Sequence, residues 1–366
     1  MIGVIGGYGD VGLQAVRMLQ KWGKVRLKIG GRNPAEARKN LGVEFAETEW
    51  VPVDAENVQS VEHFLAGCEL VINCTGPSSR LGGRVAGMCL AKGCHHIDAG
   101  VNKELESLHG APYNTISLYA AGAVPGLSGL LPRWLAKSFD QLESMLCYIG
   151  SLDRFTASAA EDYLAGASGR GNKPLAAWQN GSCRLSVLRR RERIQLPFFA
   201  REVTLYPYFD QEAEFVASSL LLNNGEWYIA SDGKQVSSLL EEVCGQFLTE
   251  RETAIRRLCR ASEIDSAGRQ RYINFIIQLS GKINGCRIDR TLVLQADRPA
   301  VLTGLAAAAA GMAVLAGEIP PGVCPLAEIV DPCSVVTRLV NANGIKQLKV
   351  FEGPIEQLLQ QVEGEI

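Results

Sequence analysis

The chain has no marked excess of charge of either sign. Its 37 Lys and Arg are balanced by 39 Asp and Glu, which gives a formal net charge of −2. Proteins that bind nucleic acid or a membrane surface electrostatically carry a basic patch or stripe, and the overall balance provides none. We therefore expect neither nucleic acid nor a membrane as a partner.

Closely spaced cysteine pairs are also missing. The 11 cysteines are odd in number, no two form a C-x-x-C pair, and most lie in apolar runs such as LVINCTG. Zinc ligands come in close pairs, and disulfide frameworks belong to oxidising compartments. The pattern predicts reduced core cysteines in a cytoplasmic protein, with no metal site.

Targeting and membrane-spanning signals are weak. The N-terminus has no basic leader, so we expect no signal peptide. The longest apolar run, residues 300–317, is rich in Ala, interrupted by Gly and short for a bilayer span. We expect a buried helix there.

Short β-rich runs alternate with helical runs through the first part of the chain. The expected strands are 1–6, 25–31, 49–54, 70–76 and 95–100, and the helices between them are 11–22, 34–41, 58–67 and 79–93. Such alternation indicates a parallel, doubly wound sheet. The fold class is therefore α/β with an N-terminal Rossmann-like domain, residues 1–124.

The alternation of short strands and helices ends after Pro125 and Gly126. The runs then predict longer, partly alternating strands at 141–152, 183–190, 226–233, 271–285 and 286–297. The last two meet at Asn284-Gly285, a strong hairpin signal. We expect a second α+β domain on a largely antiparallel sheet, residues 125–302, followed by a C-terminal helix and tail, residues 303–366.

The stretch GVIGGYGDVG contains Gly7, Gly9 and Gly12 in a G-x-G-x-x-G spacing between a strand and an amphipathic helix. The first glycine allows a tight turn, the second allows backbone N–H groups to reach a pyrophosphate, and the third allows close helix packing. The helix N-terminus adds partial positive charge. In this context the pattern predicts a dinucleotide site and not a plain turn.

The residues after the second strand indicate which dinucleotide binds. NAD-dependent proteins usually place Asp or Glu there, whereas this chain has Gly31, Arg32 and Asn33. Arg32 can pair with a 2′-phosphate through a charge-assisted fork. The cofactor is therefore predicted to be NADPH, with Arg38 as a weaker second contact and Asp54 near the adenine.

Ligands of such folds bind at the carboxyl ends of the strands. The loop after the fourth strand and the loop after the fifth strand should approach the ribose, pyrophosphate and nicotinamide. The full set of expected cofactor contacts is Gly7, Tyr8, Gly9, Asp10, Val11, Gly12, Gly31, Arg32, Asn33, Asp54, Cys74, Thr75, Gly76 and Gly100.

Six motifs together resemble the saccharopine dehydrogenase family of reductases. They are GGYGDVG, INCTGP, HHIDAG, GAVPGLSGLL, YPYFD and PPGVCPLAEIVDP. The resemblance implies a nicotinamide domain, an inserted α+β domain for substrate binding and homodimer formation, and a C-terminal helix that returns to the first domain. It also implies hydride transfer at a carbon–nitrogen bond.

Within this resemblance, the size of the chain is similar to stand-alone thiazolinyl imine reductases of siderophore (enantio-pyochelin type) biosynthesis. The sequence shows no obvious grouping of basic residues for a dicarboxylic amino acid. The leading hypothesis is an NADPH-dependent imine reductase. Two alternatives stay open: a saccharopine-type amino-acid dehydrogenase, and a non-catalytic NADP(H)-sensing regulator.

Imine reduction also needs a proton for the nitrogen. Lys103 and His96 are the first candidates for the donor, ahead of Asp98, which closes the fifth strand and could instead only hold the loop. His95 and His96 should face opposite sides of that strand.

Tyr148, near the end of the first long strand of the second domain, and Arg154, just after that strand, are the candidate substrate contacts. The run SVLRRRERIQ carries four arginines. It is either a solvated segment or a docking site for an acidic carrier domain of a nonribosomal peptide synthetase that bears a tethered imine. A small-molecule imine is the other form of the substrate.

Overall fold

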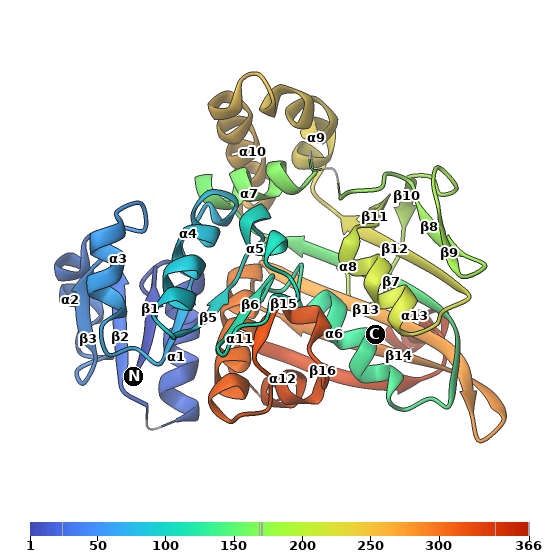
Figure 1. Ribbon diagram of the computed structural model, residues 1–366. Helices are drawn as coiled ribbons and strands as arrows, with labels where there is room; N and C mark the ends of the chain where they lie inside the picture. The colour runs from blue at the N-terminus through green and yellow to red at the C-terminus, as the bar shows by residue number, and fades with distance from the viewer. Residues whose placement is uncertain (24, 168, 170, 341, 365–366) are drawn as a thin grey trace. The chain divides into compact units, whose positions relative to one another are not determined.

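The computed structural model describes the chain except residues 24, 168, 170, 341 and 365–366. It divides into two compact units, one of residues 1–130 with 300–343 and the other of residues 131–299 with 344–366 (Figure 1). Each unit contains one sheet.

The first unit is built on seven strands that all run parallel. In spatial order they are β15 (Gly322–Pro325), β6 (Ile116–Tyr119), β5 (His95–Asp98), β4 (Leu70–Asn73), β1 (Ile2–Ile5), β2 (Leu27–Gly31) and β3 (Glu49–Pro52). The order 3-2-1-4-5-6 is that of doubly wound dinucleotide-binding sheets, with its reversal between β1 and β4. The predicted α/β class is confirmed, and β6 and β15 are additions to the expected strands.

Helices pack on this sheet through small and apolar residues. They are α1 (Asp10–Trp22), α2 (Pro34–Leu41), α3 (Val58–Leu65), α4 (Ser78–Ala91), α5 (Lys103–Ser107), α11 (Pro299–Leu315), the 3-10 helix η1 (Leu326–Glu328) and α12 (Cys333–Leu339). Val61 and Phe64 of α3 and Val85 of α4 bury against Ile5 and Val71 of the sheet.

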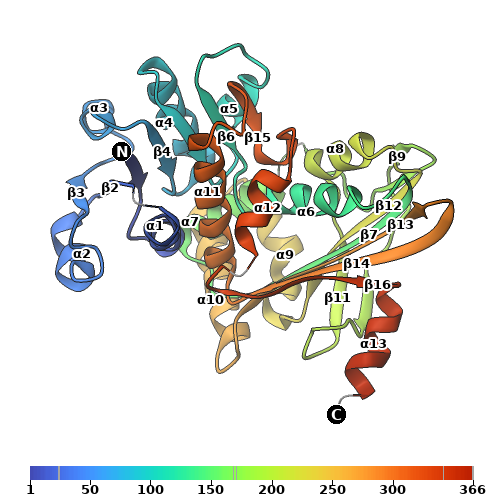
Figure 2. The same cartoon turned by 90° about the horizontal axis from the view of Figure 1, so that it is seen from below.

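The Ala-rich helix α11 lies beside α1 (Figure 2). A Cβ on Gly304 would be 2.5 Å from the carbonyl oxygen of Val11, and one on Gly311 would be 3.1 Å from Leu70. These glycines let α11 pack directly on α1 and on the sheet, which explains its buried apolar surface. Within the described residues, no helix has both the length and the hydropathy to cross a bilayer.

The second unit is built on a mixed sheet. Its main path runs β10 (Arg191–Ile194), β11 (Val203–Pro207), β12 (Asn224–Ser231), β7 (Gln141–Leu152), β13 (Tyr272–Ile283), β14 (Cys286–Ala296) and β16 (Ile345–Glu352), and β8 (Ala177–Gln179) and β9 (Ser182–Arg184) extend it from β12. Among the described strands of this path, β12 and β7 pair in parallel and the other neighbours pair antiparallel. The largely antiparallel sheet is confirmed.

The hairpin between β13 and β14 has Asn284 and Gly285 at φ values of 50° and 79°. Both positive values are those of a type I′ turn, as the Asn-Gly signal predicts. The strand expected at 183–190 is wrong, because β9 ends at Arg184 and the chain turns at Ser186, where φ is 59°.

The helices of the second unit are α6 (Leu127–Ala136), which begins in the first unit, α7 (Ala157–Ala167), α8 (Gln211–Ser219), α9 (Lys234–Phe247), α10 (Arg251–Ser266) and α13 (Ile355–Gly364). Helices α7, α9 and α10, which lie at the top of Figure 1, share a small apolar cluster. Because β16 pairs with β14, residues 344–366 belong to this unit. The segment 303–366, expected to return to the first domain, is therefore divided at residue 343.

Candidate functional site

The glycine loop joins β1 to α1, and its backbone packs so closely that side chains at two of its glycines would clash with neighbouring backbone atoms. A Cβ on Gly12 would be 2.2 Å from the oxygen of Gly6, and one on Gly7 would be 2.9 Å from the oxygen of Val4. Gly9 is the N-cap of α1 and makes no side-chain capping bond. The first N–H groups of α1 therefore have no capping side chain, which is the arrangement that binds a pyrophosphate.

The side chain of Tyr8 packs across the ends of the neighbouring strands. Its hydroxyl accepts a hydrogen bond from the N–H of Asn33 at 2.7 Å, and its ring stacks on Trp50 with centroids 6.4 Å apart. A Cβ on Gly31 would be 2.4 Å from the Tyr8 ring, so glycine is needed where the ring crosses the end of β2. Tyr8 thus connects the glycine loop to β2 and β3. Asp10 is exposed in the first turn of α1, next to the half-buried Val11.

A surface pocket opens beyond the ends of β2 and β3. Arg32, Arg38 and Lys39 bring three cations to it, Glu36 brings one carboxylate, and Trp50 brings an aromatic face. Its other lining residues are Asn33, Pro34, Ala35 and Pro52. Clustered cations beside an aromatic ring suit the 2′-phosphate and adenine of NADP(H).

The expectation that Arg32 contacts the 2′-phosphate of NADPH therefore rests on a group of cations beside an aromatic ring and not on Arg32 alone. Lys39 and Trp50 were missed, although Lys39 follows Arg38 directly and Trp50 begins the third expected strand. Asp54 is exposed after β3, where its Oδ1 accepts the N–H of Glu56 at 3.0 Å.

A buried polar network joins the ends of β4 and β5. Asn73 donates from Nδ2 to Asp98 Oδ2 at 2.7 Å, and its Oδ1 accepts from the hydroxyl of Thr75 at 2.6 Å. Asp98 Oδ1 accepts the N–H of Gly100 at 2.9 Å, and both Asn73 and Asp98 are fully buried. Asn73 and Asp98 therefore hold the loops after β4 and β5 in place, and the role of Asn73 was not apparent from the sequence.

The other residues of these loops have different environments. Gly76 is exposed and Thr75 is half-buried, whereas burial raises the pKa of the Cys74 thiol to about 12 and keeps it neutral. Asn102 caps α5 and donates to the carbonyls of Ser78 and Ser79. Lys103 follows Asn102 as the first residue of α5, and its side chain is exposed.

His96 is not placed to act as a general acid. It is fully buried in β5, its Nδ1 lies 3.0 Å from the hydroxyl of Ser117, and burial lowers its pKa to about 3. The ring is neutral at physiological pH, so the prediction of His96 as a proton donor is wrong. His95 faces away, half-buried, and its Nδ1 accepts the N–H of Ile116.

The buried His96 should make stability depend on pH. The unfolded ring protonates near pH 6.5 and the folded ring only near 3, so stability is complete above 6.5 and falls as the pH drops toward 3. Between pH 7.5 and 5 we expect His96 to cost about 2 kcal/mol of unfolding free energy. Urea unfolding of wild type and His96→Asn at both pH values measures this, and an equally steep loss in the variant would contradict it.

The two candidate substrate residues lie in the second unit and differ in exposure. Tyr148 is 6% exposed and stacks on Tyr228, with centroids 5.6 Å apart, inside a cluster that includes Leu196 and Phe199. Burial raises its pKa to about 12. As a buried core residue Tyr148 cannot contact a substrate, so that prediction is wrong. Arg154 is exposed.

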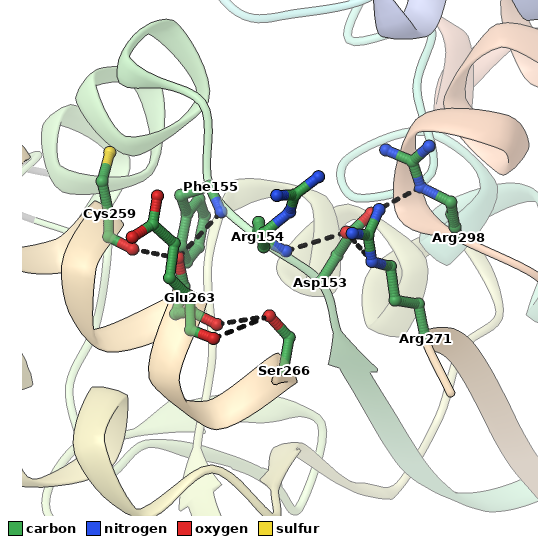
Figure 3. Close-up of polar contacts among 9 residues, drawn as sticks. Asp153, Arg154, Phe155, Cys259, Glu263, Ser266, Arg271 and Arg298 are labelled. Atoms are coloured by element: carbon green, nitrogen blue, oxygen red, sulfur yellow. Dashed lines mark hydrogen bonds and ion pairs between the residues drawn. The ribbon is translucent and has the colours of Figure 1, made fainter. Parts of the chain in front are cut away.

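Arg154 belongs to a basic cluster that the sequence does not display. Asp153, just after β7, lies 3.3 Å from Nε of Arg271 and 3.0 Å from Nε of Arg298 (Figure 3). The antiparallel register pairs Leu152 with Tyr272 and Ile273 with Ala296, which brings the three chain segments to one end of the sheet. The structure thus brings together basic residues that lie far apart in the sequence, where no such grouping was obvious.

Taken together, the parallel sheet, the glycine loop and the cationic pocket define a dinucleotide-binding domain of the Rossmann type. Residues 2–119 match the family model of the saccharopine dehydrogenase NADP binding domain. This part of the chain is therefore an NADP-binding domain of the saccharopine dehydrogenase type, and its cofactor is NADP(H).

Solved structures show the same fold over nearly the whole chain. Apo saccharopine dehydrogenase (L-Glu forming) from Saccharomyces cerevisiae has a TM-score of 0.69 at 14% identity, over 96% of this chain and 99% of that one. The homospermidine synthase of Legionella pneumophila, in complex with NAD, has a TM-score of 0.59 at 11% identity, over 96% and 91%. Identities this low show the fold alone. Comparison with curated protein sequences gave no match.

Proposed function

We propose that the protein is an NADPH-dependent reductase that transfers a hydride to a carbon–nitrogen double bond. The observation that carries this proposal is the match of residues 2–119 to an NADP-binding domain of the saccharopine dehydrogenase type, together with the cationic pocket at Arg32. The substrate that we propose is a thiazolinyl imine intermediate of siderophore biosynthesis, and the support for it is that the chain resembles stand-alone thiazolinyl imine reductases in size.

The chain's own residues have separate tasks in this reaction. The N–H groups at the start of α1 bind the pyrophosphate, and the Asn73–Asp98 network fixes the loops beside it. NADPH, when bound, supplies the hydride. The imine nitrogen then needs one proton, and we assign it to the exposed ammonium of Lys103, because His96 is buried and neutral and Asp98 is fully buried in its hydrogen-bond network.

The test follows NADPH oxidation by the purified protein with a synthetic thiazolinyl imine and, separately, with 2-oxoglutarate plus lysine. We expect oxidation with the imine alone. Oxidation with 2-oxoglutarate plus lysine would instead favour a saccharopine-type dehydrogenase, for which the fold match to the yeast enzyme is the supporting observation. Tight NADPH binding without oxidation in any mixture would favour a non-catalytic NADP(H) sensor.

The role of Lys103 has its own readout. Lys103→Met should lower kcat for the imine about 100-fold, the usual contribution of a positioned acid, while the Kd of NADPH stays unchanged. An unchanged kcat would identify water as the proton source.

We further propose that the arginine-rich segment binds an acidic carrier domain that presents a tethered imine. Arg189, Arg190, Arg191 and Arg193 are all exposed at or beside the edge strand β10. Arg190 pairs with Glu192 at 3.0 Å, and the others extend the positive charge along the edge. Reversing Arg189 and Arg193 to Glu should slow turnover of the carrier-bound imine at least ~10-fold and leave the free imine unaffected. Equal losses for both substrates would argue against docking.

A further inference from the structure

The side chain of Tyr8 joins two parts of the dinucleotide site. Tyr8 lies in the glycine loop between Gly7 and Gly9, and its hydroxyl accepts the N–H of Asn33 beside the pocket at Arg32. We propose that Tyr8 is a positioning residue, which sets the affinity for the 2′-phosphate of NADP(H) by holding Arg32 in place. This role concerns the cofactor and is independent of which substrate is reduced.

Arg32 depends on its backbone for its position. It is exposed and lines the pocket, and within the described part of the chain its guanidinium makes no hydrogen bond or ion pair. An arginine side chain loses rotamer freedom when it is fixed on a ligand, and this loss weakens binding. The loss is larger when the backbone that carries the side chain must be fixed as well.

The backbone on either side of Arg32 is held by a hydrogen bond. Before Arg32, the carbonyl oxygen of Gly31 accepts the N–H of Val53 at 2.9 Å, where β2 ends beside β3. After Arg32, the N–H of Asn33 donates to the Tyr8 hydroxyl at 2.7 Å. Asn33 is the N-cap of α2, and the first N–H groups of a helix have no partner within the helix. Tyr8 therefore supplies a partner that the helix itself cannot supply.

The ring of Tyr8 is itself held firmly. It stacks on Trp50 with centroids 6.4 Å apart and an interplanar angle of 23°, and Trp50 in turn packs on the buried Phe45. A Cβ on Gly31 would meet the Tyr8 ring, so the lack of a side chain there lets the ring cross the end of β2. The hydroxyl therefore reaches Asn33 from a ring that is packed against neighbouring strands.

The hydroxyl and the ring of Tyr8 have separable roles. If Tyr8 served only to pack the loop, phenylalanine would serve equally, because its ring has the same shape. Only the hydroxyl connects the glycine loop to the backbone beside Arg32. NADH lacks the 2′-phosphate, so its binding should depend less on this hydroxyl than the binding of NADPH does.

The test is fluorescence titration of wild type, Tyr8→Phe, Arg32→Gln and the double variant with NADPH and with NADH. Phenylalanine keeps the stacked ring, and water can accept the exposed N–H of Asn33, so we expect Tyr8→Phe to fold. Loss of this hydrogen bond should lower the ratio of NADPH affinity to NADH affinity about 3–10-fold. In the Arg32→Gln background the same change should lower the ratio less than about 2-fold, because Tyr8 acts through Arg32.

Tyr113→Phe is the matched control, because Tyr113 packs with Tyr119 and Val323 near the opposite edge of the same sheet from β3. It should keep the wild-type ratio.

The proposal is overturned if Tyr8→Phe keeps the wild-type ratio, if it weakens both nucleotides equally, or if Tyr113→Phe lowers the ratio as much. An equally large effect in the Arg32→Gln background would also overturn it, since the hydroxyl would then act without Arg32. The same holds if Arg32→Gln alone keeps the wild-type ratio. Because binding is measured without turnover, failure of this role and failure of imine reduction are separate results.

Discussion

We expect Gly12→Ala to weaken NADPH binding about 100-fold while the second unit stays folded. The new Cβ would lie 2.2 Å from the oxygen of Gly6 and 2.8 Å from the Cα of Gly7, and both are backbone atoms that no rotamer change can move. Relief requires α1 to shift away from the loop, at a cost of about 1–3 kcal/mol. That shift withdraws the helix N-terminus from the pyrophosphate. Fluorescence titration with NADPH measures the loss.

The matched control is Gly87→Ala in α4, where a Cβ would meet nothing within 4 Å. Alanine favours a helix over glycine, so this variant should gain about 0.5–1 kcal/mol of unfolding free energy and bind NADPH like wild type. If Gly12→Ala also bound NADPH like wild type, the loop would not be the pyrophosphate site.

The first sheet was predictable because its signals are local. Each expected strand is a short apolar run followed by a turn or glycine, and Gly7, Gly9 and Gly12 mark the loop within six residues. Strand β15 was missed because Gly322–Pro325 lies in a Pro-rich stretch, and only its pairing with β6, more than 200 residues earlier in the chain, makes it a strand. Pairing over such a distance leaves no periodic signal.

The residues of the candidate site also fall into those that a local sequence signal predicts and those that depend on the folded structure. Arg32 could be predicted as a phosphate contact from the sequence because it follows directly after the end of β2, and the structure places it in the lining of a surface pocket. The predictions for His96 and Tyr148 were wrong because a sequence gives residue type and spacing but not burial. Both side chains are buried, so His96 cannot act as the proton donor and Tyr148 cannot contact the substrate. The cluster of Arg154, Arg271 and Arg298 is formed by strand register alone, so no local pattern predicts it.

We expect Arg32→Gln to change which nucleotide the protein prefers. Arg32 lies in the pocket with Arg38 and Lys39, where the 2′-phosphate found only on NADPH would bind. Loss of a charge-assisted fork to phosphate should weaken NADPH about 10–100-fold and change NADH by less than about 2-fold. Parallel titrations with both nucleotides give the ratio.

Arg17→Gln is the control for Arg32→Gln, because Arg17 carries the same charge in the same unit but pairs with Glu44 at 2.7 Å. It should leave both affinities unchanged. Raising the salt concentration should weaken NADPH more than NADH in wild type, and this difference should shrink in Arg32→Gln because part of it comes from the 2′-phosphate contact. An equal loss for both nucleotides would place Arg32 against a part of the cofactor that they share, and the choice of NADPH would then rest on Arg38 and Lys39.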